Sequence, residues 1–388
     1  MDLSNLHVIV CGAATGGCAS ALLLARAGAR VTLIERVPEP KAIGAGIAIA
    51  ENGLAVLESL GLGPAMSVAR PVTDVRIVDA HGRTLLAPRG RAPRAVMIRR
   101  STLQGILLDA VAGEPRIATR FGIEVVGADA ASGTVTVRGD TGQATLEGDL
   151  VVGADGVHSR IRECGEFGAR VGASGIRYVR MLLEADVATG TEAWTPAGLF
   201  GAFPVDGGTY AFASCGTRSL GAALDAGDLA AFRSAWLHAY PASGRILALL
   251  GSIDELVQNA VIRVDCETWH DGRLVLVGDA AHAMAPNLGQ GANSALVDAA
   301  VLVDELRRSD AVPAGLAAYE SRRRRAVKRV ADASARLGRL AEVTHPLPRA
   351  VRDRLVMPVA GLFASERATA LLLQEPTDTL LAIGRITR

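Results

Sequence analysis

The chain has 388 residues, 49% of them hydrophobic, so it can bury a large core, and its length predicts about two or three domains. Its 41 basic and 40 acidic residues nearly cancel, which argues against nucleic acid or a membrane surface as a main partner. The cysteines form no Cys-x-x-Cys pair and indicate neither a metal site nor a disulfide framework. With Asp2 where a signal peptide would carry positive charge, we expect a cytoplasmic protein without a membrane span.

The first element predicted is a βαβ unit. Residues 7–10 and 31–34 are short apolar runs that predict buried strands, and the alanine- and leucine-rich stretch between them predicts a helix. The turn between the first strand and this helix has the spacing of the dinucleotide fingerprint, in which Glu35 would accept the ribose hydroxyls of an adenosine. Its small residues are Gly12, Ala14, Gly16 and Gly17, with Ala14 in place of the second glycine. A tight turn that binds nothing is the alternative.

The next segment leaves and re-enters the nucleotide-binding domain. Residues 41–51 contain too many glycines for a helix core and predict a loop, whereas residues 53–63 predict a helix. Residues 72–88 alternate around a His-Gly pair and predict a hairpin, after which the chain returns at Met97. Arg100 then opens a helix. Its guanidinium could bridge to a pyrophosphate or could be solvated, and both interpretations stay open.

The middle of the chain changes character. Residues 135–146 predict another hairpin, and residues 150–162 form a second buried strand that ends in Asp155 and Gly156. From residue 175 to residue 267, longer alternating segments with aromatic residues predict an antiparallel domain. The nucleotide-binding domain is therefore expected to be discontinuous.

A hairpin inside that antiparallel domain has a predictable register. A two-residue turn at Asp206 and Gly207 pairs Phe203 with Tyr210, and Gly201 with Phe212. One apolar face would then carry Leu199, Phe203, Tyr210 and Phe212. This face either packs against a helix or forms a substrate pocket, in which Tyr210 would supply a polar handle.

Residues 273–301 hold the most informative stretch. A buried strand at 274–277 ends in Gly278 and Asp279, where an acidic side chain at a sheet edge can accept bonds from sugar-like hydroxyls. A loop containing Pro286, Gly289, Gln290 and Gly291 then leads into a helix from Ala292 onward. The N–H groups at that helix start, with about half a positive charge, favour a ligand edge that becomes anionic, as one edge of a reduced flavin does. A helix-entry loop with a structural aspartate is the alternative.

Two further features are interpreted as structural rather than functional. Residues 319–339 are crowded with arginine, which in a neutral protein indicates a long surface helix rather than a polyanion site. His282 could be a base, but in the turn GDAAH we expect it to pack against or cap the loop.

Three separated motifs occur in one order, GAATGG with Glu35 and Arg36, then GADGVHSRIR, then GDAAHAMAPNLGQGAN. Together they resemble the FAD-dependent aromatic hydroxylases of the para-hydroxybenzoate hydroxylase type, over roughly residues 6–335. The resemblance implies an α/β fold with a Rossmann-like, discontinuous FAD-binding domain, an antiparallel-sheet substrate domain and a C-terminal helical region. The expected division is 1–71, 97–174 and 270–312 for the FAD-binding domain, 72–96 and 175–269 for the substrate domain, and 313–388 for the helical region.

The motifs and the resemblance together imply a set of site residues. FAD is expected to bind at Gly12, Ala14, Gly16, Gly17, Glu35, Arg36, Arg100, Asp155, Gly278, Asp279, Pro286, Gly289, Gln290, Gly291, Ala292 and Asn293. The catalytic positions expected are Pro286, Gln290 and Tyr210, and those in contact with substrate are Phe203, Tyr210 and Phe212.

The resemblance also implies a reaction. NADPH or NADH would reduce FAD, O2 would form a C4a-hydroperoxyflavin, and one oxygen atom would pass to a small aromatic or heteroaromatic substrate. A monomer or homodimer is expected. A flavoprotein reductase, a flavin-dependent halogenase and a nucleotide-sensing protein without activity remain alternatives, although Trp194, Trp236 and Trp269 lie too far apart for the halogenase tryptophan motif.

Overall fold

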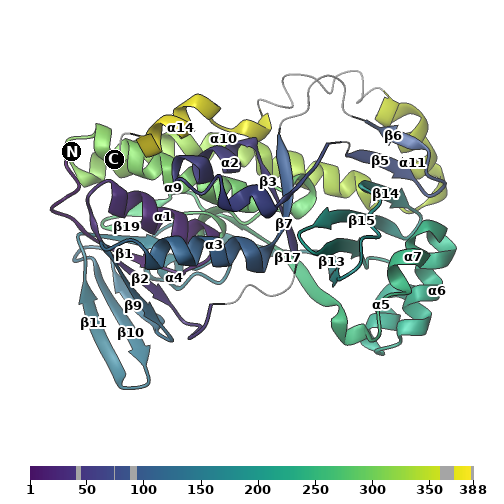
Figure 1. Ribbon diagram of the computed structural model, residues 1–388, viewed down its shortest axis with the longest axis horizontal. Helices are drawn as coiled ribbons and strands as arrows, with labels where there is room; N and C mark the ends of the chain where they lie inside the picture. Colours follow the sequence, from purple (N-terminus) through teal and green to yellow (C-terminus); the bar gives the residue numbers. More distant parts are fainter. Residues whose placement is uncertain (41–44, 74, 88–93, 359–370, 386–388) are drawn as a thin grey trace.

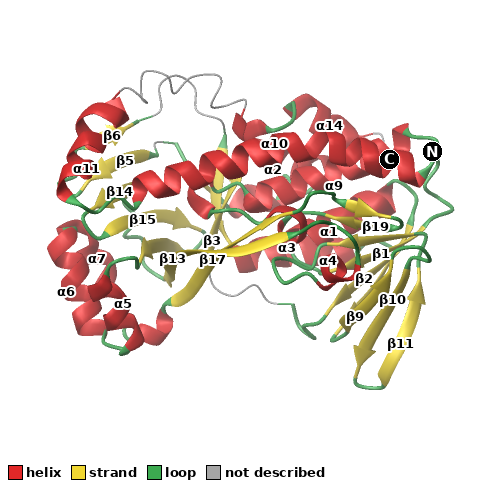
Figure 2. Ribbon diagram, turned by 180° about the vertical axis from the view of Figure 1, so that it is seen from behind, coloured by secondary structure: helices red, strands yellow, loops and turns green. Residues whose placement is uncertain are grey.

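The computed structural model describes residues 1–40, 45–73, 75–87, 94–358 and 371–385. Two lobes are visible, one built on a mainly parallel sheet and holding both ends of the described chain, the other built on a larger, mainly antiparallel sheet (Figure 1). The long helix α10 (Val312–Ala341) runs from the first lobe to the second (Figure 2). The expected fold class, a Rossmann-like α/β domain with an antiparallel sheet and C-terminal helices, is confirmed.

The first lobe contains a six-stranded sheet. Its order is β18 (His270–Asp271), β19 (Leu274–Leu276), β12 (Leu150–Gly153), β1 (His7–Cys11), β2 (Arg30–Glu35) and β8 (Ile117–Phe121). All neighbours are parallel except β18 and β19. Because helices cover this sheet, residues 8–11 of β1 are completely buried and apolar rather than alternating. The carboxyl ends of β1, β12 and β19 therefore meet at one edge.

Helices pack around this sheet and its three motifs. Those of the first lobe are α1 (Thr15–Arg26), α2 (Glu51–Ser59), α3 (Arg100–Ala112), α4 (Arg160–Cys164), α8 (Asp279–His282), α9 (Gly291–Arg308) and α14 (Thr377–Arg385), with the 3-10 turns η1 (Ala65–Val68) and η4 (Pro286–Leu288). Two small antiparallel sheets flank them, β11 (Gly142–Glu147), β10 (Thr134–Gly139) and β9 (Glu124–Asp129), and β3 (Gly46–Ala50), β7 (Ala95–Arg99) and β4 (Arg70–Pro71).

The strand β3 corrects the loop expected at residues 41–51. Residues 41–44 lie outside the described residues, but Gly46–Ala50 pairs with β7 along its whole length. The glycines hid an alternating pattern in which Ile47 and Ile49 are buried. This strand matters for the site because it lies between the third motif and the second lobe.

The second lobe contains a seven-stranded sheet. Its order is β17 (Val257–Asp265), β13 (Arg170–Leu183), β16 (Gly208–Ser214), β15 (Gly198–Val205), β14 (Thr191–Thr195), β5 (Arg76–Asp79) and β6 (Thr84–Leu86). The predicted register of the β15–β16 hairpin is confirmed, since Phe203 pairs with Tyr210 and Gly201 with Phe212. Helices on this side are α5 (Arg218–Asp225), α6 (Leu229–Ala239), α7 (Gly244–Leu247), α11 (Pro346–Val351), η2 (Pro241–Ser243), η3 (Ile253–Glu255) and the π-helical turn η5 (Arg352–Val356).

The two faces of this sheet have different neighbours. Phe200 packs against Trp236 and Tyr240 of the helical layer, with ring centroids 5.1 and 5.8 Å apart. Phe203, Tyr210 and Phe212 lie on the opposite face, which looks toward β3 and β7 of the first lobe. The hairpin therefore presents its aromatic face to the region between the lobes.

The long surface helix expected at residues 319–339 is α10, but one of its faces is buried. It is amphipathic, and both Tyr319 and Arg323 are completely buried. The Tyr319 hydroxyl donates to the carbonyl of Leu276 at 3.1 Å, which joins the helix to the end of β19. None of the helices in the described ranges combines the length and apolar character that a membrane crossing needs.

Candidate active site

Close backbone packing brings the three sequence motifs together. A Cβ on Gly17 would stand 1.8 Å from the carbonyl oxygen of Gly12 and 3.3 Å from the Cβ of Ala154, so the first and second motifs meet without room for a side chain. A Cβ on Gly16 or Gly278 would stand 3.1 or 2.8 Å from the Cβ of Ala295 on α9, so the first and third motifs also meet. Small residues at these crossings place all three turns at one sheet edge.

Glu35 lies beside the first turn, as the fingerprint requires. One carboxylate oxygen accepts the backbone N–H of Ala13 at 3.0 Å, and the other accepts that of Val37 at 3.0 Å. Each oxygen keeps a further lone pair that can accept a hydroxyl. Ala14 and Arg36 are both exposed, so the methyl group of Ala14 does not fill the turn. The turn itself needs glycine at Gly12, whose φ is +101°.

Asp155 in the second motif is held at the same edge. Its Oδ2 accepts the backbone N–H groups of Arg160 and Ile161 at 2.7 and 3.1 Å. Its Oδ1 is buried and has no hydrogen-bond partner within the described ranges. Burial raises the pKa of Asp155, although bonds from Ser159 and the backbone oppose that shift. A buried acceptor without a partner is suited to a hydroxyl donor from a ligand.

Asp279 and Arg100 stand near one another at the third motif. Gly278 turns the chain with a φ of +60°, and Asp279 is exposed at the start of α8. The backbone N–H of Arg100 donates to the carbonyl of Ala45 at 2.8 Å, which fixes the start of α3 beside β3. Although the Arg100 side chain reaches solvent, surrounding protein atoms and the charge of Arg180 lower its pKa, while Tyr210 and Asp279 oppose that shift. These four groups therefore share one local electrostatic field.

The loop before α9 is fixed to β3 by one buried amide. Asn293 accepts the N–H of Ala50 at 2.9 Å and donates to the carbonyls of Ala48 and Gly289 at 3.0 and 2.8 Å. Gly289 is left-handed, with a φ of +62°. The first-turn N–H groups of Gly291, Ala292 and Asn293 have no helical carbonyl to bond, so they can serve an acceptor or a negative charge.

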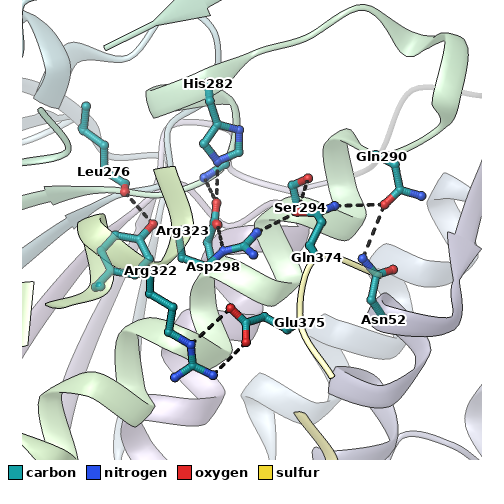
Figure 3. A network of polar contacts seen from close by, with 12 residues as sticks. Asn52, Leu276, His282, Gln290, Ser294, Asp298, Arg322, Arg323, Gln374 and Glu375 are labelled. Atoms are coloured by element: carbon teal, nitrogen blue, oxygen red, sulfur yellow. Dashed lines mark hydrogen bonds and ion pairs between the residues drawn. The ribbon is translucent and has the colours of Figure 1, made fainter. Parts of the chain in front are cut away.

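The side chain of Gln290 lies in a buried network. Only 3% of the residue is exposed, and its side-chain oxygen accepts from Gln374 at 3.1 Å and from Asn52 at 3.4 Å (Figure 3). The side chain thus points into a buried polar network, and only the backbone of Gln290 remains to contact a ligand at the loop. Pro286, which begins η4, is exposed.

A buried carboxylate, Asp298 of α9, holds the third motif in place. It accepts the N–H of Gly278 at 3.0 Å, bonds His282 Nε2 at 2.5 Å and accepts from Arg323 Nε at 2.8 Å (Figure 3). Burial alone would raise the pKa of Asp298, but the charges and hydrogen bonds of His282 and Arg323 outweigh it and lower that pKa. His282 also packs on Trp269, so in the structure it is both a partner of Asp298 and a packing residue.

These features fit FAD. Glu35 offers acceptors for a ribose, Asp279 offers an exposed carboxylate for sugar-alcohol hydroxyls, and the start of α9 offers N–H donors at the end of a long helix. Residues 5–334 match the family described as FAD binding domain.

The chain belongs to the FAD-binding domain family.

Two relatives of this chain are named as monooxygenases. The chain is 32% identical over 371 residues to a kynurenine 3-monooxygenase of Salinispora arenicola, covering 86% of this chain and 80% of that one. It is 29% identical over 395 residues to an aurachin C monooxygenase/isomerase of Stigmatella aurantiaca, covering 95% and 97%. The resemblance to FAD-dependent aromatic hydroxylases is confirmed, and the protein is an FAD-dependent monooxygenase.

A solved structure supports the fold. The chain matches that of Klebsiella pneumoniae HpxO complexed with FAD and uric acid with a TM-score of 0.79, covering 98% of both chains at 22% identity.

The aromatic face of the β15–β16 hairpin lies close to the FAD-binding motifs. Phe203 and Phe212 stack with centroids 6.0 Å apart, and Tyr210 lies 5.5 Å from Phe212. A Cβ on Gly46 of β3 would stand 2.4 Å from the Tyr210 ring, so Tyr210 rests on the strand that Asn293 also holds. Burial raises the pKa of Tyr210, while Arg180 and Arg100 oppose that shift.

Sequence reasoning missed several polar groups on this face. Arg180 of β13 pairs opposite Phe212, and its alternation within β13 was the only signal available. Tyr178, two residues earlier, accepts from Asn287 of η4 at 3.3 Å and donates to Glu342 at 3.4 Å. Glu192 of β14 accepts from Trp194 Nε1 at 2.7 Å. No local motif marks these residues, and the partners of Arg180 and Tyr178 are distant in sequence.

Glu192 makes the stability of this flavoprotein depend on pH. Burial, aided by the negative charge of Glu342, raises the pKa of Glu192 from 4.5 to about 7. Folding therefore favours the protonated form, so the stability that Glu192 contributes is complete below pH 4.5 and is lost as the pH rises to about 7.

We expect Glu192→Gln, a neutral side chain of the same shape, to escape this loss. Relative to the natural protein, the free energy of unfolding of the variant should increase by as much as about 3 kcal/mol as the pH rises across that interval. Urea unfolding at several pH values measures the difference. A difference that does not change with pH would show that the pKa of Glu192 is the same in the folded and unfolded protein.

Proposed function

We propose that the protein hydroxylates a small aromatic or heteroaromatic ring, using O2 and either NADPH or NADH as the reductant. Relatives named for kynurenine and aurachin C support a ring as the substrate. One dinucleotide fingerprint is present, so the nicotinamide would bind transiently rather than in a Rossmann domain of its own. A monomer or homodimer, with the domain division given above, completes the proposal.

The observation that carries this proposal is the aromatic face of the β15–β16 hairpin beside the FAD motifs. Phe203, Tyr210 and Phe212 form an apolar surface that suits a flat ring. Arg100 and Arg180 supply positive charge next to it. An apolar surface with a few converging polar groups is what a small-molecule site requires.

The residues around the cofactor have separable roles in this proposal. When bound, FAD supplies the redox and oxygen-transfer chemistry. Glu35 would hold the adenosine ribose, with Gly12, Ala14, Gly16, Gly17 and Arg36 around the adenosine and pyrophosphate, and Arg100 and Asp155 would contact the pyrophosphate and sugar alcohol. Asp279, after Gly278, would accept hydroxyls of the sugar alcohol.

The loop and the hairpin would act on the reacting groups. Pro286, Gly289, Gln290, Gly291, Ala292 and Asn293 would line the ring system of the cofactor. Their N–H groups at the start of α9 would stabilise negative charge by up to about 2 kcal/mol. Tyr210 would orient the substrate by a hydrogen bond, and Arg180 would stabilise negative charge on the substrate ring. The packed aromatic face would exclude water.

The test is oxidation of NADPH and NADH by the FAD-loaded protein with a panel of phenols, quinolones, purines and pyridines, with oxygen uptake and product mass recorded together. We expect slow oxidation alone and about tenfold faster oxidation with the right ring, because an enzyme that activated oxygen without its substrate would waste reductant. The product should be heavier by one oxygen atom. A product formed without oxygen uptake would make the protein a reductase.

We expect Tyr210→Phe to lower kcat/KM about three- to tenfold with the best substrate, since one neutral hydrogen bond is lost. FAD content and the thermal midpoint should stay near those of the natural protein. The matched control is Tyr240→Phe, because Tyr240 packs on the opposite face of the same sheet and should leave turnover unchanged. Unchanged kcat/KM in Tyr210→Phe, or a loss of stability instead, would assign Tyr210 to the core.

A further inference from the structure

A short segment near the C-terminus is held against the FAD-binding lobe by side chains from three helices. We define the C-terminal strap as residues 372–375. Its Glu375 carboxylate accepts from Arg322 of α10 at 3.1 and 2.8 Å, and these side chains are 8% and 23% exposed. At its other end, Asn52 of α2 donates to the carbonyl of Leu372 at 3.0 Å. Both ends of the strap are therefore anchored.

The backbone between these anchors is unusual. Gln374 has a φ of +62°, and within the described ranges it is the one residue other than glycine with a positive φ. A side chain with a Cβ disfavours this region, so surrounding contacts must hold it there. Such positions tend to occur where geometry serves a function.

The Gln374 side chain supplies those contacts. Its Oε1 accepts from Arg323 Nη2 at 2.8 Å and from Ser294 Oγ at 3.1 Å. Its Nε2 donates to Gln290 Oε1 at 3.1 Å. Figure 3 shows Gln374 lying between the Asp298–Arg323 pair and Gln290. One amide therefore connects the buried ion pair to the loop before α9.

These hydrogen bonds form a series, the amide chain, that runs from Arg323 through Gln374, Gln290 and Asn52 to the Leu372 carbonyl. The groups at its two ends fix the direction of every bond in it. Arg323 can only donate, so Gln374 must turn its oxygen toward Arg323 and its nitrogen toward Gln290. The Leu372 carbonyl can only accept, so Asn52 must turn its nitrogen toward it and toward Gln290. Gln290 therefore faces two donors, and reversing its amide would set N–H against N–H.

Gln290, whose side-chain amide is fixed in this way, directly precedes the residues 291–293 whose N–H groups would face the flavin. Gln290 is the N-cap of α9, and its carbonyl accepts the N–H of Ser294 at 2.8 Å. Asn293 ties the same loop to β3 from the other side. The loop is thus held by one side chain from each direction.

We propose that Gln374 is a positioning residue for the flavin. Through the amide chain it fixes the peptide of Gln290, and with it the aim of the N–H groups of residues 291–293. This proposal rests on the FAD position given under Proposed function, and on no contact between Gln374 and the cofactor itself.

The test is Gln374→Glu at neutral to alkaline pH. The substitution keeps the shape and the oxygen that Arg323 and Ser294 need, and it replaces only the donor to Gln290 by a second acceptor. In the protein freed of FAD, we expect hydrogen exchange of the Ser294 amide, which donates to the Gln290 carbonyl, to become at least about tenfold faster. We also expect the FAD dissociation constant to rise about tenfold and the flavin midpoint potential to shift.

Two comparison variants separate positioning from general stability. Glu375→Gln weakens the anchor to Arg322 but leaves the amide chain intact, so it should lower the thermal midpoint without moving the flavin potential. Gln290→Glu keeps the acceptor that both neighbours face, so exchange of the Ser294 amide should stay slow. If Gln374→Glu does not fold, Gln374→Met, which removes all three side-chain hydrogen bonds without adding charge, replaces it with the same expectations.

Natural exchange rates and a natural potential in Gln374→Glu would overturn the proposal. Changes in Glu375→Gln that match those in Gln374→Glu would do so as well, because they would show a general loss of stability. The exchange measurement needs no cofactor and can therefore be interpreted separately. Fast exchange in Gln374→Glu with an unchanged FAD dissociation constant and potential would also overturn the proposal. It would show that Gln374 holds the loop but that the loop does not contact the flavin.

Discussion

One buried carboxylate, Asp298, is the interaction on which the site depends. Its charge is completely desolvated and is compensated by Arg323 and by His282, and it also accepts the N–H of Gly278. A buried charge that loses its partner is strongly unfavourable, so these groups hold a single arrangement. That arrangement joins α9, α10 and the turn after β19. Ala295, on the same helix, contacts Gly16 and Gly278, and so the first and third motifs meet at a fixed distance.

The arrangement of the candidate site follows from how the two lobes share the short strand β3. Asn293 bonds this strand from the side of the FAD motifs, and the ring of Tyr210 rests on Gly46 from the side of the large sheet. The loop that would bind the cofactor and the hairpin that would face the substrate therefore both contact the backbone of β3. Oxygen-transfer chemistry needs fixed donors, and the shared strand holds the loop and the hairpin against one another.

The sequence predicted what depends on near neighbours. The glycine turns, the strand ends at Asp155 and Asp279 and the hairpin register all arise from residues a few positions apart, and the comparisons confirmed the family. Partners distant in sequence decided the rest. Gly46–Ala50 became a strand only through pairing with β7, Arg323 became buried only through Asp298, and the Gln290 side chain turned away from the loop toward Gln374. No local pattern encodes those choices, because each satisfies a buried group on another element.

The most direct test of this account is the FAD affinity of Asp298→Asn, measured by titrating the FAD-free protein, with urea unfolding in parallel. Asp298 contacts the turn rather than the cofactor, yet the account predicts FAD binding weakened at least about tenfold and about 3–5 kcal/mol of stability lost, because Arg323 would keep a buried charge without its partner. Asp304→Asn, on the same helix and paired with Arg322, should retain the natural FAD affinity. A folded Asp298→Asn protein that bound FAD as tightly as the natural one would contradict the account.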